Sequence, residues 1–504
     1  MILKMEFIPT TEESYPFQAA AGKCNFEAAG YAEEEHFMSG TANVYTEKGF
    51  DHAVTPRYEN CPYTTRLIVR RPKDVSRFSG NVVVEILNAS ACMDIDRMWV
   101  NTWKYIMRHG DIYIGISSKG HVVDALKRFD EKRYEKINWA NPDPSREIPD
   151  KSKWGIGPFM EQYESGLYWD MQNDLARLLR TENPLNPIRE YGRSYLYLLG
   201  WSQSTLYVNR TIHSFANQSG SEKGSPLFDG YLMAGGDSSL APINAYEPAA
   251  SDGRIFMEGS VPAQGQVFAK EPVIAINTES ENRGANWGAD QDVPGCRFRS
   301  WQLPGTSHDT KYNLLDYYEG YLARDTEKIG QGLSFAGVEG EPLDVPYQYI
   351  FHAALNALYA WVRDNVPAPH APRIETAAAG EEDCDPFVIG KDAPSIKVKN
   401  LTDAFGNAKG GIRIASVEYP VGRYSSACKR KDGSFDALFG TVYPFPPAML
   451  TALYGDLEKY RSLIEQNAEE LIAAGFLLPD DRQDYVTEHV ETARKRGLEG
   501  LKNK

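Results

Sequence analysis

The sequence is poor in cysteine, and the six that it has are scattered along the chain: Cys24, Cys61, Cys92, Cys296, Cys384 and Cys428. No two of them have the C-x-x-C spacing that is typical of a zinc knuckle or a dithiol redox pair. They are therefore expected to be reduced thiols. Neither a metal nor an organic cofactor is expected.

Basic clusters are few, and long apolar runs are missing. The formal net charge is -15, whereas nucleic-acid binding needs clustered Lys and Arg, so no nucleic-acid partner is expected. No run approaches the roughly 18 consecutive apolar residues of a membrane span. The first residues lack the apolar segment and the small-residue cleavage site of a secretory signal. The resulting expectation is a cytoplasmic protein without a membrane span, with a homo-oligomer left open.

The chain does contain short apolar segments in the order typical of α/β proteins. Runs typical of strands lie at 65–71, 81–87, 111–116, 195–199, 228–234, 272–277 and 297–303. The last of these runs alternates as an edge strand does. Helical spacing is found at 98–109, 160–180, 347–364, 448–475 and 480–497. Strand, helix and strand joined by short links predict a mostly parallel central sheet flanked by helices.

At 504 residues the chain is long enough for one large α/β core with additions. We predict N-terminal strands and loops over 1–75, a core over 76–366, and a C-terminal helical extension over 367–504 that packs on the core. Two stretches within the core are too long for plain connectors. They are predicted to be lid insertions at about 118–158 and 237–270.

The most informative stretch runs from Tyr195 to Arg210. Its apolar run ends at Gly200, Ser202 follows two residues later, and a segment able to form a helix comes next. Strand, sharp turn and helix form a nucleophile elbow, in which the serine hydroxyl is exposed above the carboxyl end of a parallel sheet. Gly-x-Ser-x-small recurs by chance in a chain of this length, so the flanking strand and helix are what favour Ser202 as the nucleophile.

A serine hydroxyl is a poor nucleophile until a base takes its proton. His308 lies in the loop just after the last predicted core strand, where this fold places its histidine, and it is the candidate base. The orienting acid belongs after the strand at 272–277, where both Glu279 and Glu281 occur. The two share the same parity, and Glu279, nearer the sheet, is slightly preferred.

The oxyanion of the reaction needs two backbone N–H groups. One is expected from Gln203, which follows the nucleophile, and the other from the loop after the strand at 81–87, at Asn88 or Ala89. No glycine run of the HGGG type is present there. Most aromatic side chains of a globular protein belong to its core. Trp201, His121 and Trp287 nevertheless fall in or beside loops at the catalytic end and are candidates for contacting a substrate.

With these residues in place, the sequence resembles the α/β-hydrolase superfamily, and within it a bacterial and fungal group described as alpha/beta hydrolase domain proteins. The resemblance spans nearly the whole chain from about residue 28. The matching segments are 30–35, 63–66, 84–88, 200–204, 278–281, 298–308, 406–413 and 443–445. It implies a serine-esterase triad and a C-terminal region that is part of one unit, but no substrate. Ser204 stands where glycine is more usual, and Glu281 where the group tends to have aspartate, while the group's glutamate falls on Glu279.

The combined hypothesis is a serine carboxylic-ester hydrolase that acts on a small-molecule ester through a Ser-His-Glu triad and an acyl-enzyme. Two alternatives stay open. An acyltransferase would use the same triad with an alcohol or amine in place of water. A noncatalytic ligand-binding protein would keep only the scaffold, since fold alone does not establish function.

Overall fold

The computed structural model describes residues 1–500 except for 21–22, 49–51, 146–162, 218–225, 247–260, 263–268, 283–286, 320–322, 331–334, 336, 381–397 and 437. The chain clusters into two compact units. The first comprises Met1–Val273, Asn286–Phe298 and Gly320–Leu333, and the second comprises Ile274–Ala285, Arg299–Glu319 and Ser334–Lys504. The three-part division made from the sequence stays a prediction. The end of the first predicted lid insertion, 146–158, and most of the second, 247–260 and 263–268, lie outside the described residues.

The main sheet has ten strands among the described residues, in the order β1-β2-β3-β5-β4-β6-β7-β10-β12-β11. Their bounds are β1 Ile2–Ile8, β2 Tyr31–Lys48, β3 Ala53–Pro72, β4 Asn81–Ile86, β5 Ile112–Ile116, β6 Tyr195–Trp201, β7 Gly230–Ala234, β10 Val273–Thr278, β11 Gln291–Val293 and β12 Cys296–Leu303. A short pair, β8 Ser239–Leu240 and β9 Val261–Pro262, lies outside this sheet. The predicted mostly parallel central sheet is confirmed.

The middle of the sheet is parallel and buried on both faces. In β4 the residue Val84 pairs with Ile114 of β5 on one side and with Leu198 of β6 on the other. All residues of β4, β5 and β7 are buried, as are all but the first of β6. Strands covered on both faces read as continuous apolar runs, which is why the sequence reveals these four so clearly.

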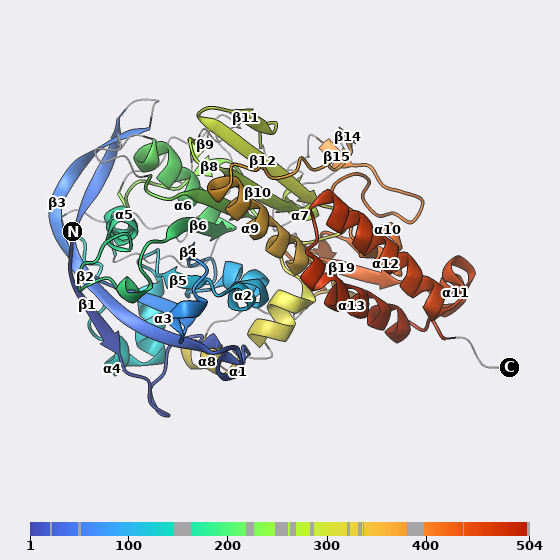
Figure 1. Ribbon diagram of the computed structural model, residues 1–504, viewed down its shortest axis with the longest axis horizontal. Helices are drawn as coiled ribbons and strands as arrows, with labels where there is room; N and C mark the ends of the chain where they lie inside the picture. The colour runs from blue at the N-terminus through green and yellow to red at the C-terminus, as the bar shows by residue number, and fades with distance from the viewer. Residues whose placement is uncertain are drawn as a thin grey trace. The chain divides into compact units, whose positions relative to one another are not determined.

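Helices of the first unit cover both faces of these strands. Figure 1 shows α5 (Tyr168–Leu178) and α6 (Gln203–Thr211) on one side of β4 to β6, with α2 (Arg97–His109) on the other. The rings of Trp169 on α5 and Tyr207 on α6 stack with centroids 5.2 Å apart. The shorter helices are α1 Phe26–Ala29, α3 Val122–Phe129, α4 Glu131–Tyr134 and α8 Ala323–Ile329. Single turns lie at Val75–Arg77, Ser165–Leu167 and Arg189–Tyr191, and a short π-helix, Ile212–Ala216, follows α6 directly.

A buried carboxyl group fixes the start of α2. Glu85 on β4 accepts hydrogen bonds from the backbone N–H groups of Met98 and Trp99 at 2.8 and 2.9 Å, and from the Tyr113 hydroxyl at 2.8 Å. These bonds satisfy N–H groups that have no acceptor within the helix. Burial, with a further contribution from the charge of Asp96, raises the pKa of Glu85 to about 8. The residue therefore ties α2 to the strand beneath it.

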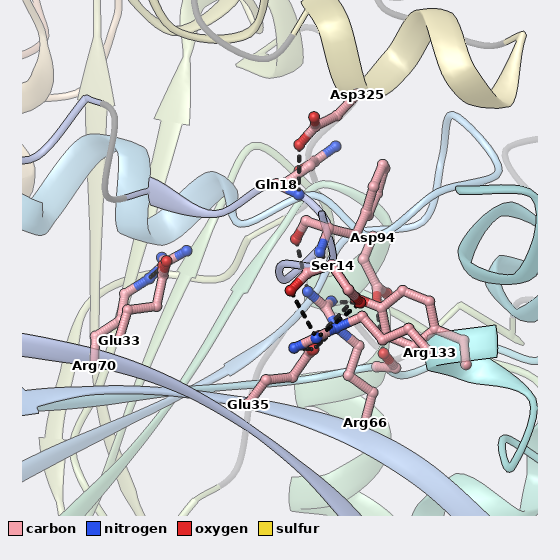
Figure 2. A network of polar contacts seen from close by, with 12 residues as sticks. Ser14, Gln18, Glu33, Glu35, Arg66, Arg70, Asp94, Arg133 and Asp325 are labelled. Carbon is pink, nitrogen blue, oxygen red and sulfur yellow. Dashed lines mark hydrogen bonds and ion pairs between the residues drawn. The ribbon is translucent and has the colours of Figure 1, made fainter. Parts of the chain in front are cut away.

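The N-terminal strands are much longer than the short pieces that the sequence suggests. β2 and β3 have 18 and 20 residues and pair antiparallel. Beside them lies a buried ionic network, in which Arg66 pairs with Glu35 and Asp94, and Arg133 also pairs with Glu35 (Figure 2). All four side chains are nearly inaccessible to solvent. Burial raises the pKa of Asp94, and the guanidinium of Arg66 opposes that shift.

The second unit carries the C-terminal elements. Its helices are α7 Glu279–Asn282, α9 Gln348–Arg363, α10 Ala415–Glu418, α11 Pro447–Tyr454, α12 Leu457–Ala474 and α13 Arg482–Lys495, with a π-helix at Lys311–Glu319 and a single turn at Pro479–Asp481. Its short strands are β13 Glu341–Pro342, β14 Thr376–Ala378, β15 Val398–Asn400, β16 Gly422–Ser425, β17 Cys428–Lys429, β18 Phe435–Asp436 and β19 Thr441–Pro444. The pair His352 and Asp481, 2.7 Å apart and buried, joins α9 to the turn that precedes α13.

Two predicted elements differ from the structure. The predicted helix at 448–475 is two helices, because Gly455 has φ 76° and Asp456 then caps α12 by accepting from Glu458 N and Lys459 N. Strand β12 was expected at the sheet edge, but its residues Cys296–Phe298 pair antiparallel with β11. The alternation of β12 therefore does not mark an edge.

The buried network generates a stability prediction. Arg66→Met should lower the free energy of unfolding by about 3–5 kcal/mol, because it leaves the buried carboxylate of Asp94 without a guanidinium and that of Glu35 with Arg133 alone. Urea unfolding measures this change. Lys73→Met is the control, because its pair with Glu27 is exposed and its loss should leave stability unchanged. Equal effects of the two substitutions would contradict the importance given to the network.

Candidate active site

The turn between β6 and α6 holds its serine in a strained conformation. Ser202 has φ 55° and ψ -122°, a region that side-chain-bearing residues rarely adopt. Its N–H donates to the carbonyl of Ala234 at 2.7 Å, and its carbonyl accepts from Thr205 N at 2.8 Å. The Thr205 hydroxyl donates to the same Ala234 carbonyl at 3.0 Å. The end of β7 therefore holds the turn in place.

Two glycines make room for this turn. A methyl group on Gly200 would lie 2.6 Å from the Ser204 carbonyl oxygen and 2.8 Å from Val208 Cγ2. A methyl group on Gly236 would lie 2.8 Å from Thr205 Cβ and 3.1 Å from the Ser202 carbonyl oxygen. At each glycine the closest of these contacts is under 3.0 Å, which is shorter than packing around a Cβ atom allows. Gly200 was expected from the motif, whereas nothing in the sequence marked Gly236.

The loop after β4 is bonded to the turn. Asn88 donates through Nδ2 to the carbonyl of Trp201 at 2.9 Å, while its backbone N–H donates to the Ile95 carbonyl at 2.9 Å. Both donor groups of Asn88 are thus used in holding the loop, so Asn88 fits a positioning role better than the oxyanion donor expected from the sequence. Ala89 is the remaining candidate in the loop. Gln203 is the first residue of α6, so its N–H has no acceptor within the helix.

The three residues expected to contact a substrate occupy different environments. His121 Nε2 lies 2.9 Å from the Ala89 carbonyl, so the imidazole contacts the loop after β4. Trp287 donates through Nε1 to the Gly236 carbonyl at 3.2 Å, beside the Ser202 turn. Trp201 has no exposed surface in the first unit. A substrate contact for each of them stays a prediction.

A buried lysine near the turn was not identified from the sequence. Lys119, in the loop after β5, donates through Nζ to Ser118 Oγ at 2.6 Å, to Ser204 Oγ at 3.2 Å and to the Leu87 carbonyl at 3.3 Å. Its ammonium also lies 4.3 Å from the ring centroid of Tyr207. Lysines are almost never fully buried, and nothing in the local sequence signals this one.

The second unit brings a histidine and a carboxylate together. His308 Nδ1 lies 2.8 Å from Glu281 Oε1, and both side chains are buried. The other oxygen of Glu281 accepts from the backbone N–H and the hydroxyl of Thr278 at 2.7 and 2.6 Å. The backbone of His308 is held as well, because its N–H donates to Ser280 Oγ at 3.2 Å and its carbonyl accepts from the Tyr347 hydroxyl at 3.2 Å.

The slight preference for Glu279 does not agree with this hydrogen bonding. Glu279 Oε2 accepts from the backbone N–H of Gly305 at 2.7 Å, and its own N–H donates to Thr306 Oγ1 at 3.3 Å. Equal parity would place the two glutamates on one face of an extended chain. Residues 279–282 instead form a helical turn, α7. At about 100° per residue, side chains two apart on a helix point in nearly opposite directions.

Two further properties bear on the kind of site. Among the described residues, no group of three or more His, Cys, Asp or Glu side chains is placed to hold a metal ion. In the same part of the chain, no helix is both long and apolar enough to cross a membrane.

A family model described as "Alpha/beta hydrolase domain" matches residues 4–487. No curated protein matches the chain. Similar solved structures include the siderophore hydrolase EstA from Aspergillus nidulans, at 12% identity and TM-score 0.28, covering 58% of this chain and 92% of that one. Esterase Est22 matches at 11% identity and TM-score 0.29, over 60% of this chain and 80% of that one. A serine hydrolase homologue from Coxiella burnetii matches at 10% identity and TM-score 0.25, over 53% of this chain and 90% of that one. These likenesses carry no argument about activity.

The packing at Gly200 gives a second prediction. Gly200→Ala should lower the free energy of unfolding by about 1–3 kcal/mol, because the added methyl group overlaps the first turn of α6. Thermal or urea unfolding would measure it. Gly500→Ala serves as the control, since a methyl group there meets no atom within 4 Å. If both variants unfold like the wild type, the close approach at Gly200 is not rigid.

Proposed function

The chain belongs to the alpha/beta hydrolase domain family, and from that premise we propose that it is a serine carboxylic-ester hydrolase. The family membership agrees with the α/β-hydrolase fold expected from the sequence and supports a hydrolase role. The finer proposal names Ser202 as nucleophile, His308 as base and Glu281 as the acid that orients the histidine. The observation that carries it is the strained backbone of Ser202 at the start of α6.

Strain of this kind costs about 1–3 kcal/mol and persists only where the surroundings fix it. The Ala234 carbonyl and the two close glycines fix it here. A residue with a purely structural role could relax by a small change of backbone, whereas a nucleophile must stand clear of its own strand and helix. The conformation of Ser202 therefore supports a catalytic serine.

The bond between His308 and Glu281 supports the assignment of the base. A carboxylate at Nδ1 keeps the proton on that nitrogen, which leaves Nε2 able to accept the serine proton. In the proposed reaction Ser202 Oγ attacks the ester carbonyl and its proton passes to His308. The imidazolium then protonates the departing alcohol. Water next attacks the acyl-enzyme by the same route, releasing the acid and restoring the serine.

The charge that develops on the carbonyl oxygen needs donors already in place. The proposal assigns this role to the N–H groups of Gln203 and Ala89. The Asn88 carbonyl accepts from Ile95 N at 2.8 Å. A trans peptide points its N–H opposite to its carbonyl, so this bond sets the direction of the Ala89 N–H. No cofactor is required.

The nucleophile is tested by covalent labelling. A fluorophosphonate probe should label the wild-type chain at one residue, and Ser202→Ala should abolish the label, because only an activated serine reacts. Mass spectrometry of the labelled peptide identifies the site. Ser204→Ala, two residues away, is the matched control and should still be labelled. Equal labelling of Ser202→Ala and wild type would reject the assignment. Reaction products formed with competing alcohols would separate hydrolysis from acyl transfer.

The two glutamates provide a second test of the same proposal. Glu281→Gln should lower kcat on an aryl ester by about 10⁴-fold, because the amide no longer selects the tautomer of His308 in which Nδ1 carries the proton. Glu279→Gln keeps a side chain able to accept from Gly305 N and should change kcat by less than about tenfold. A larger loss in Glu279→Gln than in Glu281→Gln would transfer the acid role to Glu279.

A further inference from the structure

The carbonyl of Leu87 accepts hydrogen bonds from three donors. Leu87 is the residue before Asn88 and Ala89 in the loop after β4. The Ser118 hydroxyl donates to this carbonyl at 2.7 Å, Lys119 Nζ at 3.3 Å and the Ser204 hydroxyl at 3.4 Å. A carbonyl ordinarily has two lone pairs to offer. These donors come from the ends of two different elements, the loop after β5 and the first turn of α6. Leu87 is thus bound to both.

Lys119 is the only cation among these donors, and the number of its acceptors equals the number of its N–H groups. An ammonium has three N–H groups, and the structure provides Ser118 Oγ, Ser204 Oγ and the Leu87 carbonyl as acceptors. The face of the Tyr207 ring lies 4.3 Å away and favours a cation. The site is therefore built for a charged amine, although it is fully buried.

The same contacts link the two segments that carry the proposed oxyanion donors. Leu87 precedes Asn88 and Ala89, while Ser204 follows Gln203. On the other side, Asn88 Nδ2 donates to the Trp201 carbonyl. A displacement of the Leu87 carbonyl would shift the next peptide and with it the Ala89 N–H, since peptide units are planar and rigid. Lys119 thus lies where it can control the spacing between Ala89 N–H and Gln203 N–H.

We propose that Lys119 is a positioning residue that, as an ammonium, holds the Leu87 carbonyl and Ser204 together and so fixes the separation of the two oxyanion donors. This inference rests on the proposed function and deepens it. Lys119 does not touch the substrate and transfers no proton. The serine at 204, in place of the more usual glycine, is explained as the acceptor that this lysine needs.

Because Lys119 acts as an ammonium, its hold on the Leu87 carbonyl and Ser204 should depend on pH. Burial lowers the pKa of Lys119 to about 7, and the carboxylate of Asp94 opposes that shift. The other groups that face the ammonium are the Tyr207 ring, Ser118, Ser204 and the Leu87 carbonyl. The amine is charged below its pKa, so its contribution should be complete at low pH and should fade as pH rises through about 7.

The test measures the rate constant of fluorophosphonate labelling at Ser202 as a function of pH, together with the labelled fraction at saturation. Lys119→Met keeps an unbranched side chain that is shorter by one atom, and it removes all three N–H donors. We expect its labelling rate to fall by roughly tenfold or more at pH 6, short of the ~10²–10³-fold typical of deleting an oxyanion donor outright. The labelled fraction should remain as in the wild type. In Lys119→Met the labelling rate should no longer decline as the pH rises through about 7. Lys132→Met, exposed on α4, is the control and should behave like the wild type.

A milder variant covers the case in which Lys119→Met does not fold. Ser204→Ala keeps the lysine but removes one acceptor of its ammonium, so the alkaline decline should move to lower pH. If Lys119→Met, or Ser204→Ala where the former does not fold, has the wild-type rate and pH profile, the inference is overturned while the proposed function stands. A smaller labelled fraction with an unchanged pH profile would assign Lys119 a purely structural role and also overturn it. If no chain is labelled at Ser202, the proposed function itself fails.

Discussion

The backbone conformation of Ser202 is the constraint on which the first unit's site depends. A side-chain-bearing residue at φ 55° is held against its own preference, so every neighbour of the turn must leave room for it or bind it. Gly200 and Gly236 leave room, and the carbonyl of Ala234 binds it. The parallel pairing of β6 with β7 brings that carbonyl to the turn. The pairing of β6 with β7 in the sheet therefore holds Ser202 in its strained conformation.

The buried charges of Arg66, Asp94 and Lys119 lie in one connected region. Asp94 accepts from Arg66 at 3.0 Å and from the Ser117 hydroxyl, and the loop that contains Ser117 continues to Lys119. An isolated buried charge is very costly, but buried charges that are paired and fully bonded are tolerated. The N-terminal strand β3 therefore contributes through Arg66 to the region around Ser202. This gives the long hairpin a role beyond extending the sheet.

The sequence predicts the parts of the fold that follow a simple period. Buried parallel strands such as β4 and β6 are continuous apolar runs, and the motif around Gly200 places Ser202 at a strand end. What the sequence cannot provide is conformation over a few residues. The helical turn α7 decides which of Glu279 and Glu281 approaches His308, yet four residues carry no detectable period. Lys119 escapes notice for a related reason, because its burial comes from contacts with Leu87 and Ser204, far away in the sequence.

The use of glutamate in place of aspartate at position 281 has a physical counterpart in the structure. Glutamate has one more methylene group and one more rotatable bond than aspartate, so holding its carboxylate still costs more conformational entropy. The two bonds from Thr278 restrain that freedom by fixing Oε2, which leaves Oε1 directed at His308 Nδ1. Thr278 is the last residue of β10, so the strand itself supports the acid. The longer side chain thereby reaches a defined position, and the pair His308–Glu281 gains the rigidity that the proposed base would need.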